Sequence, residues 1–376
     1  MADLKQELAQ IQGRLAALKK DCLAKMGEHG GDAVINAGSA VARKLKARPA
    51  RKLGGHFGKA MSLDFAEGGI MSSVGQDGLL LVWDTWKGCR KAQPITLSSM
   101  FAMCTAISTD ADVVCAGGLS NVLHVYTLNG PASGQRAGSL VGDFEGHDGY
   151  VSCAKFVDKR EILSSSGDGT LACWDVSRGA KAPVAVFREH TADVSACDVS
   201  SSARDVFASC STDGTVKFWD KRSGSTTGTV RLSEGDDLSQ IGFVPGSSTT
   251  VACSVAGEGR GENHGQFLVI DARAMAKLTS FRGTASKRFE CTSVAWSGSG
   301  RLLFGGTTDD DNPKNLLVFD VNGGKDATQK LKTGDLRTSD VAVSKDGCGV
   351  AGANWMNGMS NRYSEGKAHQ NISIFS

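Results

Sequence analysis

From about residue 51 to the end, the chain consists of short apolar runs separated by turns. Runs at residues 79–83, 113–116, 171–174 and 216–219 carry the aromatic, β-branched and small side chains of half-buried β-strands. Three of these runs follow an Asp-Gly pair (Asp77-Gly78, Asp168-Gly169 and Asp213-Gly214), which is a strong local signal for a tight turn between antiparallel strands. The pattern predicts an all-β region built from short antiparallel strands.

A different periodicity occupies the first 26 residues. Apolar side chains recur there at alternating intervals of four and three residues, at Leu4, Leu8, Ile11, Leu15, Leu18 and Cys22. This three-heptad seam predicts an amphipathic helix over residues 3–26, about 36 Å long. The seam either folds back on its own domain or pairs with another chain. We favour a partner, because a repeat array satisfies its own core.

The apolar runs belong to one sequence motif that is repeated along the chain. Each clear copy begins with a His, continues to an Asp-Gly turn and ends with Trp-Asp, and 28 or 30 residues separate the His from the final Asp. The His, turn Asp and Trp of the three copies are His56, Asp77 and Trp83; His147, Asp168 and Trp174; and His190, Asp213 and Trp219. Weaker copies occupy residues 99–128, 237–273, 288–321 and 338–376.

Seven copies of about 40–45 residues predict an all-β, seven-bladed β-propeller with four strands in each blade. The residues before Leu53 are expected to supply the outermost strand of the last blade and so close the ring. This sequence motif resembles the WD40 repeat. Its His, turn Asp and Trp, with a Ser on the adjacent strand, can form a buried hydrogen-bonded chain. We therefore expect a structural role for these residues rather than a metal site or a catalytic one.

The composition agrees with this fold and argues against several classes of function. The 376 residues include 47 Gly and only 6 Pro, which suits many tight turns. The net charge of +2 gives no electrostatic case for nucleic acid, and no apolar run approaches the ~20 residues of a membrane span. The N-terminus lacks the features of a signal peptide. The 11 cysteines lack zinc-site spacing, so we expect small buried hydrophobes in a reducing compartment.

Three stretches resemble blades of the beta subunit of heterotrimeric G proteins, which is a WD40-repeat signalling protein. Residues 52–56 through 82–84 resemble its first blade, residues 115–121 its second, and residues 145–153 with 165–168 its third. The resemblance covers essentially the whole chain and is strongest in the first four blades. It implies an N-terminal coiled-coil helix at residues 1–30, a basic linker at 31–50 and the propeller at 51–376.

In that family the helix pairs with a small gamma subunit, and the top of the propeller binds the alpha subunit. The resemblance thus makes the apolar seam a gamma-type interface. Positions that match alpha-contact residues are Lys59, Leu119, Tyr150, Asp193, Asp237 and Trp355. Four positions have lost bulk: Met61 replaces Tyr, Met100 replaces Trp, and Ala102 and Ser195 each replace Met. A truncated anchor can cost about 2 kcal/mol, whereas Met61 and Met100 keep apolar area within the expected interface.

Several other segments leave alternatives open. Residues 43–52 hold six basic residues in ten, which fits a solvated linker, a nuclear address or a patch for an anionic surface. Connections at 257–265, 308–313 and 356–370 are longer than the repeat requires, and such loops commonly serve added partners. The acidic run 309–311 suits a solvated loop better than a calcium site. The glycines at 257–261 lack the strand–helix context of a phosphate loop.

These observations predict a non-catalytic protein-interaction platform without a cofactor. The leading interpretation is a cytoplasmic G-protein beta-type subunit that pairs with a gamma-like helix, docks a GTPase alpha subunit or effectors, and reaches a membrane only through a lipidated partner. The alternative is a beta-like scaffold of a cytoskeletal or ciliary (axonemal) assembly, which the altered anchors, long loops and weak last blades favour. An enzyme is least favoured, because no Cys–His, Ser–His or carboxylate pair stands out.

Overall fold

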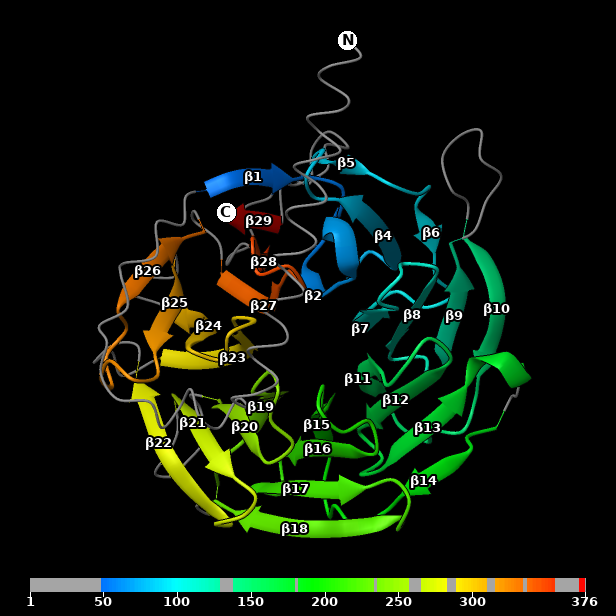
Figure 1. The fold of residues 1–376 in the computed structure, drawn as a ribbon. Helices are drawn as coiled ribbons and strands as arrows, with labels where there is room; N and C mark the ends of the chain where they lie inside the picture. Colours follow the sequence, from blue (N-terminus) through cyan, green and yellow to red (C-terminus); the bar gives the residue numbers. More distant parts are fainter. Residues whose placement is uncertain are drawn as a thin grey trace, which may run out of the picture.

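The computed structural model describes residues 49–128, 138–179, 182–232, 235–256, 265–282, 289–309, 315–333, 337–355 and 372–375. These residues form seven antiparallel sheets arranged as a ring around a central axis (Figure 1). The predicted seven-bladed β-propeller is therefore confirmed. The expected helix at residues 3–26, with all six residues of its apolar seam, lies outside the described residues.

Blades 1 to 3 follow one another along the chain. Blade 1 contains β2 (Ala60–Phe65), β3 (Ile70–Gly75) and β4 (Leu79–Asp84), with its outer position split between β5 (Cys89–Arg90) and β6 (Ile95–Thr96). Blade 2 contains β7 (Ala102–Ile107), β8 (Val113–Gly118), β9 (Leu123–Thr127) and β10 (Ser139–Phe144). Blade 3 contains β11 (Val151–Phe156), β12 (Glu161–Ser166), β13 (Leu171–Asp175) and β14 (Ala185–Phe187). Short 3-10 helices occupy Glu67–Gly69 and Val176–Arg178.

Blades 4 to 6 continue in the same order. Blade 4 contains β15 (Val194–Val199), β16 (Val206–Ser211), β17 (Thr215–Asp220) and β18 (Ser225–Arg231). Blade 5 contains β19 (Leu238–Phe243), β20 (Thr250–Val255), β21 (Gln266–Asp271) and β22 (Ala276–Arg282). Blade 6 contains β23 (Phe289–Trp296), β24 (Leu302–Asp309), β25 (Asn315–Asp320) and β26 (Gln329–Lys332).

Blade 7 joins the two ends of the described chain. It contains β27 (Arg337–Val343), β28 (Val350–Trp355) and β29 (Ile372–Phe375), and its outer strand is β1 (Pro49–Leu53). Strand β1 pairs with β29 in antiparallel register, with Leu53 opposite Ile372. The residues before Leu53 thus supply the outermost strand of the last blade, and this pairing closes the ring.

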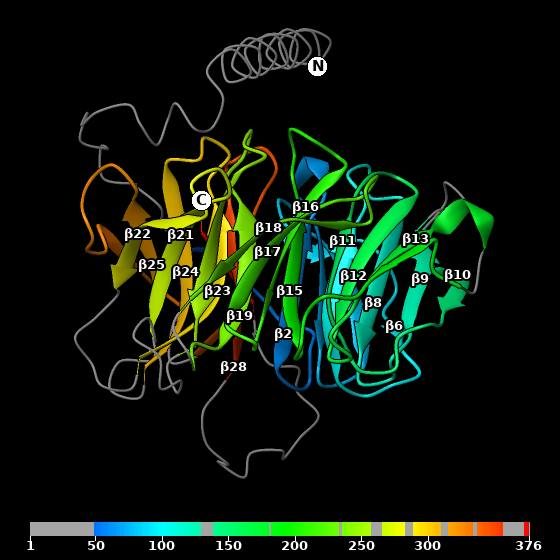
Figure 2. The same cartoon turned by 90° about the horizontal axis from the view of Figure 1, so that it is seen from below.

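The propeller has two faces, which Figure 2 shows edge-on. The innermost strands β2, β7, β11, β15, β19, β23 and β27 surround the axis, and the chain runs into all of them from the same face (Figure 1). We name this the leading face. Because neighbouring strands are antiparallel, the turns that join the second strand of each blade to the third lie on the leading face as well.

Large apolar side chains fill the space between neighbouring blades. Phe144, from the outer strand of blade 2, packs edge-on against Trp174 of blade 3, with ring centroids 5.8 Å apart. Phe187, from the outer strand of blade 3, packs in the same way against Phe207 and Trp219 of blade 4, at 4.9 and 5.6 Å. Each blade therefore buries its apolar surface against its neighbour, as the repeat pattern predicts.

Every innermost strand has an irregularity at one residue near its start, where the pairing with the next strand shifts register. Such bulges redirect a side chain away from the regular pleat. Four hydroxyls at this position donate hydrogen bonds to a carbonyl at or near the start of the innermost strand of the next blade: Ser152 to Val194, Ser239 to Cys291, Thr292 to Thr338 and Ser339 to Ala60. Blades 1 and 2 carry Met61 and Met103 at this position instead.

Candidate functional site

All of the residues predicted for alpha-type contacts lie on the leading face. Lys59, Tyr150, Asp193 and Asp237 each immediately precede an innermost strand, and Met100 lies just before β7. Leu119 follows β8, and Trp355 is the last residue of β28, where its backbone is paired with Arg337. Met61, Ala102 and Ser195 lie in the first two residues of β2, β7 and β15. The strand order therefore gathers residues from blades 1 to 5 and 7 at one end of the ring.

A repeated backbone hydrogen bond fixes the residues that lead into the innermost strands. In four blades the carbonyl of the leading residue accepts from an N–H that follows the second strand: Lys59 from Gln76 at 2.9 Å, Tyr150 from Gly167 at 2.9 Å, Asp193 from Thr212 at 3.1 Å and Asp237 from Ala256 at 2.7 Å. Each leading loop is thus held against the neighbouring turn, so that its side chain is presented by a rigid backbone.

An apolar group is exposed on the leading face at blades 1 and 2. Met100 is 69% exposed and Leu119 is 54% exposed. Two phenylalanines that the sequence reasoning missed, Phe57 and Phe101, are 49% and 47% exposed. The carbonyl of Phe101 accepts a hydrogen bond from the Leu119 N–H at 3.4 Å, which places these two residues side by side. Exposed large apolar side chains that gather in one place are typical of a protein-binding surface.

Phe101 is held in an unusual backbone conformation, with φ at +75°. For a residue with a Cβ this left-handed region costs roughly 1–2 kcal/mol. The surrounding structure therefore maintains a strained backbone that leaves a large aromatic side chain half exposed. The sequence did carry a signal: Met100 and Phe101 are consecutive large apolar residues in a turn, and Phe57 occupies a position where the other clear repeats have Asp148 and Thr191.

Blades 3 and 4 present a polar group instead. The Tyr150 hydroxyl donates to Asp193 Oδ2 at 2.9 Å and so connects the two blades. Burial raises the pKa of Tyr150 to about 12, and the hydrogen bond and the negative charge of Asp193 act in the same direction. Gly167 makes this arrangement possible, since a Cβ there would lie 2.3 Å from the tyrosine ring. Asp237 is exposed on the leading loop of blade 5.

Lys59 and Met61 lie at the start of blade 1. Both are half-buried, as are Ser195 and Asp193, whereas Ala102 is buried. Burial lowers the pKa of Lys59, and the positive charge of Arg337 lowers it further. The leading face thus carries apolar side chains over blades 1 and 2, and carboxylates over blades 4 and 5.

The repeated His, Asp and Trp residues lie beneath this face and bond to one another. In blade 4, His190 Nδ1 is 2.9 Å from Asp213 Oδ2, and His190 Nε2 is 2.8 Å from Ser209 Oγ. The Trp219 indole N–H also donates to Ser209 Oγ, at 2.8 Å. Blades 1 and 3 repeat the arrangement with His56, Asp77, Ser73 and Trp83, and with His147, Asp168, Ser164 and Trp174.

The titration behaviour of this network suits a structural role. Burial lowers the pKa of His147 and His190, so the neutral imidazole is favoured. Burial raises the pKa of Asp213, but hydrogen bonds from Thr215, His190 and Thr191 outweigh it and hold the pKa at about 2. Within the described ranges, no group of three or more His, Cys, Asp or Glu side chains is arranged to hold a metal ion.

Blade 2 has a substitute network that the sequence reasoning did not identify. His124 lies on the third strand, β9, where its Nδ1 is 2.6 Å from Asp143 Oδ1 and its Nε2 is 3.0 Å from Ser98 Oγ. His124 is buried, as are His56 and His147 of the clear repeats. A lone His inside the apolar run 122–126 was the available signal for it.

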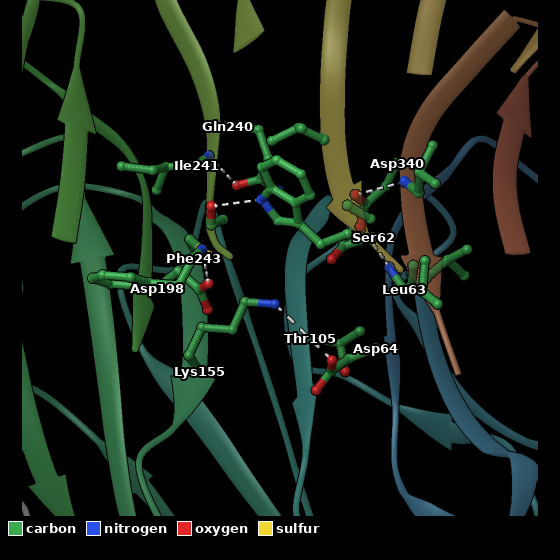
Figure 3. A pocket seen from close by; sticks show the side chains of 18 of the residues that line it. Ser62, Leu63, Asp64, Thr105, Lys155, Asp198, Gln240, Ile241, Phe243 and Asp340 are labelled. Carbon is green, nitrogen blue, oxygen red and sulfur yellow. Dashed lines mark hydrogen bonds and ion pairs between the residues drawn. The ribbon is translucent and has the colours of Figure 1, made fainter. Parts of the chain in front are cut away.

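A second feature that the sequence reasoning did not identify is a charged cavity of about 200 Å³ on the propeller axis, lined by innermost strands (Figure 3). Lys155 points into it, with Nζ 4.0 Å from Asp64 Oδ1. Burial lowers the pKa of Lys155, but the negative charges of Asp64 and its neighbours outweigh burial and raise it.

The carboxylates of this cavity also connect neighbouring blades. Each accepts a backbone N–H from the next innermost strand: Asp64 from Ile107 at 2.9 Å, Asp198 from Phe243 at 2.7 Å and Asp340 from Leu63 at 2.8 Å. Burial raises the pKa of both Asp198 and Asp340. These hydrogen bonds give the three carboxylates a structural role around the axis.

The remaining predictions fall on residues whose structure is not described. The apolar seam of the N-terminal segment lies outside the described residues, as do most of the three long connections, at 257–264, 310–314 and 356–371. In the part of the chain that the structure describes, no helix is long and apolar enough to cross a membrane.

Known proteins are similar to this chain both in its repeat and over most of its length. The family described as "WD domain, G-beta repeat" matches residues 138–175 and 181–220. The guanine nucleotide-binding protein subunit beta of Zea mays is 30% identical over 318 residues, which are 81% of this chain and 80% of the relative. The corresponding proteins of Arabidopsis thaliana and Nicotiana tabacum are each 31% identical, over 320 and 315 residues, and about four fifths of each chain is again covered. Because the likeness extends across the propeller at this identity, the chain belongs to the family of guanine nucleotide-binding protein beta subunits.

Proposed function

We propose that this protein is a beta-type subunit of a G-protein signalling complex and acts as a non-catalytic platform. Its leading face docks a GTPase alpha subunit or effectors, and its N-terminal seam pairs with a gamma-like helix. The observation that carries the proposal is the leading face itself, in a chain whose relatives are beta subunits. That face joins an exposed apolar group at Met100, Phe101 and Leu119 to a polar group at Tyr150 and Asp193.

The physical character of the leading face supports protein binding rather than chemistry. Interface hot spots are built from large apolar or aromatic anchors with a few charged neighbours, held on a rigid frame. Met100, Leu119 and Phe57 supply apolar area at blades 1 and 2, while Asp193 and Asp237 supply charge on the loops of blades 4 and 5. Binding partners would compete for this surface, so signalling would follow from which partner occupies it. We also propose a cytoplasmic location, with membrane contact only through a lipidated partner.

The test is a pull-down with two charge-introducing variants. Phe101→Asp with Leu119→Asp is expected to abolish recovery of a GTPase alpha subunit, because each lost hot-spot anchor weakens binding roughly 30-fold. Ile11→Asp with Leu15→Asp is expected to abolish recovery of the gamma-like chain. Leu140→Asp is a matched control, because Leu140 is also 54% exposed but lies on the outer strand β10. An alpha subunit that binds the leading-face variant as well as it binds the control would refute the proposal.

A second function is favoured by the altered anchors. Met61, Met100, Ala102 and Ser195 replace larger side chains of the family pattern, and Ala102 is buried at the start of β7. A surface changed in this way suits a different partner, as in a beta-like scaffold of a cytoskeletal or ciliary assembly. The same pull-down separates the two functions, because recovery of axonemal or cytoskeletal proteins without any GTPase supports the scaffold.

A further inference from the structure

Two cysteines meet at the seam between blades 3 and 4. Cys153 lies on β11 and Cys197 on β15, the innermost strands of these neighbouring blades. The Cys153 thiol donates a hydrogen bond to the carbonyl oxygen of Cys197 at 3.5 Å, and the side chains of the two cysteines are electrostatically coupled. Both cysteines are free thiols. This contact joins residues that are far apart in the sequence, and it is distinct from the leading-face surface described above.

One of the two thiols can be reached from the axial cavity. Cys153 lines this cavity together with Lys155 and Asp198, while Cys197 is completely buried behind it. Cys153 and Lys155 are two residues apart on one strand, so their side chains lie on the same face of β11 (Figure 3 shows Lys155 in the cavity). A cavity of about 200 Å³ accommodates several molecules of the size of water. Hydrogen peroxide is similar in size to water, so the cavity can hold it.

The surroundings of Cys153 lower the pKa of its thiol. The hydrogen bond from Cys197 lowers the pKa of Cys153, burial raises it, and the positive charge of Lys155 lowers it again. The pKa of Cys197 is raised well above its usual range by its hydrogen bond to Cys153 and by burial. The two thiols therefore differ in character: one is the nucleophile beside the cavity, and the other is its buried neighbour.

We propose that Cys153 and Cys197 form a redox-modification site, at which a peroxide entering the axial cavity oxidises both thiols to a disulfide between blades 3 and 4. The Cys153 thiolate attacks one oxygen of hydrogen peroxide; an S–O bond forms, the O–O bond breaks, and hydroxide leaves as water after taking a proton. The sulfur of Cys197, having lost its proton, then attacks the sulfenic acid. The S–S bond forms, the S–O bond breaks and a second water leaves. Two thiols are oxidised by two electrons, and one peroxide is reduced to two waters.

A competing thiol is Cys104, on the innermost strand of blade 2. Its Sγ lies 3.7 Å from the carbonyl oxygen of Val151, but burial raises its pKa well above the usual range. Cys104 does not line the axial cavity as described by the structure. A general reactivity of buried cysteines would involve Cys104 as well, whereas the proposed site is specific for one pair.

A disulfide at this seam would act on the leading face as well. The same seam is crossed by the Tyr150–Asp193 hydrogen bond and by the bond from Ser152 to the Val194 carbonyl. A covalent connection between β11 and β15 would restrict any opening of blade 3 against blade 4. We therefore expect the amides of these strands to exchange more slowly with solvent in the oxidised protein.

The test is peptide mapping of the folded, full-length protein after treatment with hydrogen peroxide. Digestion with trypsin under non-reducing conditions is expected to yield residues 137–155 joined to residues 189–204, each with a single cysteine, and the product should have lost two hydrogen atoms. Thiol reductant should reverse the linkage. In Cys197→Ser, Cys153 should accumulate as a sulfenic acid that a dimedone probe captures, and Cys153→Ser should leave Cys197 unmodified.

Cys104→Ser is the matched control, and it should form the Cys153–Cys197 linkage at an unchanged rate. The proposal is overturned if the folded wild-type protein keeps Cys153 and Cys197 reduced at peroxide concentrations that oxidise exposed Cys89. It is also overturned if the linked peptides contain Cys104 in place of Cys197. The wild-type map alone decides between these results, so a folding defect in a variant does not affect the test.

Discussion

Blades 4 and 5 are neighbours with the same strand order, yet they are stabilised by different chemistry. Blade 4 contains the chain of Asp213, His190, Ser209 and Trp219. The strand registers place Cys253 of blade 5 at the position of Ser209, and Ile270 at the position of Trp219. Both blade 5 residues are fully buried. Apolar packing is therefore sufficient to form a blade, and the polar chain has another role.

That role is visible in the turn between the second and third strands. In blade 4 only residues 212–214 separate β16 from β17, and the Asp213 carboxylate accepts the backbone N–H groups of Thr215 and Thr191 at 2.9 and 3.1 Å. In blade 5 the corresponding connection is longer, from 256 to 265. The polar chain thus ties a short turn to the leading loop, whereas blades without it can carry longer connections on the same face.

The largest expected effect is that of Trp219→Ala, because the Trp219 side chain belongs both to the polar chain and to the apolar core of blade 4. Trp219 packs against Phe187 and stacks on Phe207, and its indole donates to Ser209. We expect the free energy of unfolding to fall by about 3–5 kcal/mol in urea denaturation. Ile270→Ala in blade 5 removes fewer atoms and no hydrogen bond, so its loss should be smaller. An equal or larger loss there would contradict a special dependence of blade 4 on its Trp.

A smaller loss is expected from Ser209→Ala, which interrupts the polar chain but keeps the bulk. The change leaves His190 Nε2 and the Trp219 indole N–H without the hydroxyl that both now contact. Leaving buried polar groups unpaired should lower the free energy of unfolding by about 2–3 kcal/mol. Cys253→Ala is the blade 5 counterpart and should cost only about 1 kcal/mol, because it removes one small apolar group. Similar losses for both variants would show that the polar chain adds no stability.

The pH dependence of stability should also separate the two kinds of blade. The pKa of His190 is lower in the folded protein than in the unfolded chain, so the unfolded chain binds protons first as the pH falls below about 6.5. Asp213, with a folded pKa of about 2 against 3.8, stabilises the fold above pH 3.8 and loses this effect between about 4 and 2. Both groups therefore weaken the fold in acid.

Urea denaturation across this pH range checks the expectation. Asp213→Asn cannot ionise, so its stability should fall less steeply than that of the wild-type protein between pH 4 and 2. Ile270→Val in blade 5 alters no titratable group, and its curve should run parallel to the wild-type curve. A wild-type slope that persists unchanged in Asp213→Asn would remove Asp213 from the acid response.

The parts of this structure that could be predicted from the sequence are those that repeat. The sequence motif from His190 to Trp219 recurs at a regular interval. A repeated unit that cannot bury its own apolar face must pack against its neighbours, and this implies a closed ring. The pair of Cys153 with Cys197 and the hydrogen bond from Leu63 to Asp340 follow no period. They depend on which innermost strands become neighbours and on the bulge that shifts each register, so no local pattern indicates them.

The leading-face residues show the same limit. Leu119 could be placed from a resemblance, because it lies in a recognisable motif after a strand. The exposure of Phe101 depends on a backbone with φ at +75°, which propensities for that residue type disfavour. His124 takes its role from Ser98 and Asp143, which flank it at a spacing unlike that of the clear repeats.

The smallest effect, and the only gain, is expected from Ser254→Ala in blade 5. The Ser254 hydroxyl is buried and has no hydrogen-bond partner among the residues that the structure describes, at a position where blade 4 has the buried Cys210. A buried hydroxyl without a partner is destabilising, so its removal should raise the free energy of unfolding by about 1 kcal/mol in urea denaturation. Ser209→Ala is the same chemical change on the second strand of the adjacent blade, and its effect should have the opposite sign. If both substitutions destabilise the protein, then blade 5 also depends on a buried hydroxyl, and the contrast between a polar blade 4 and an apolar blade 5 does not hold.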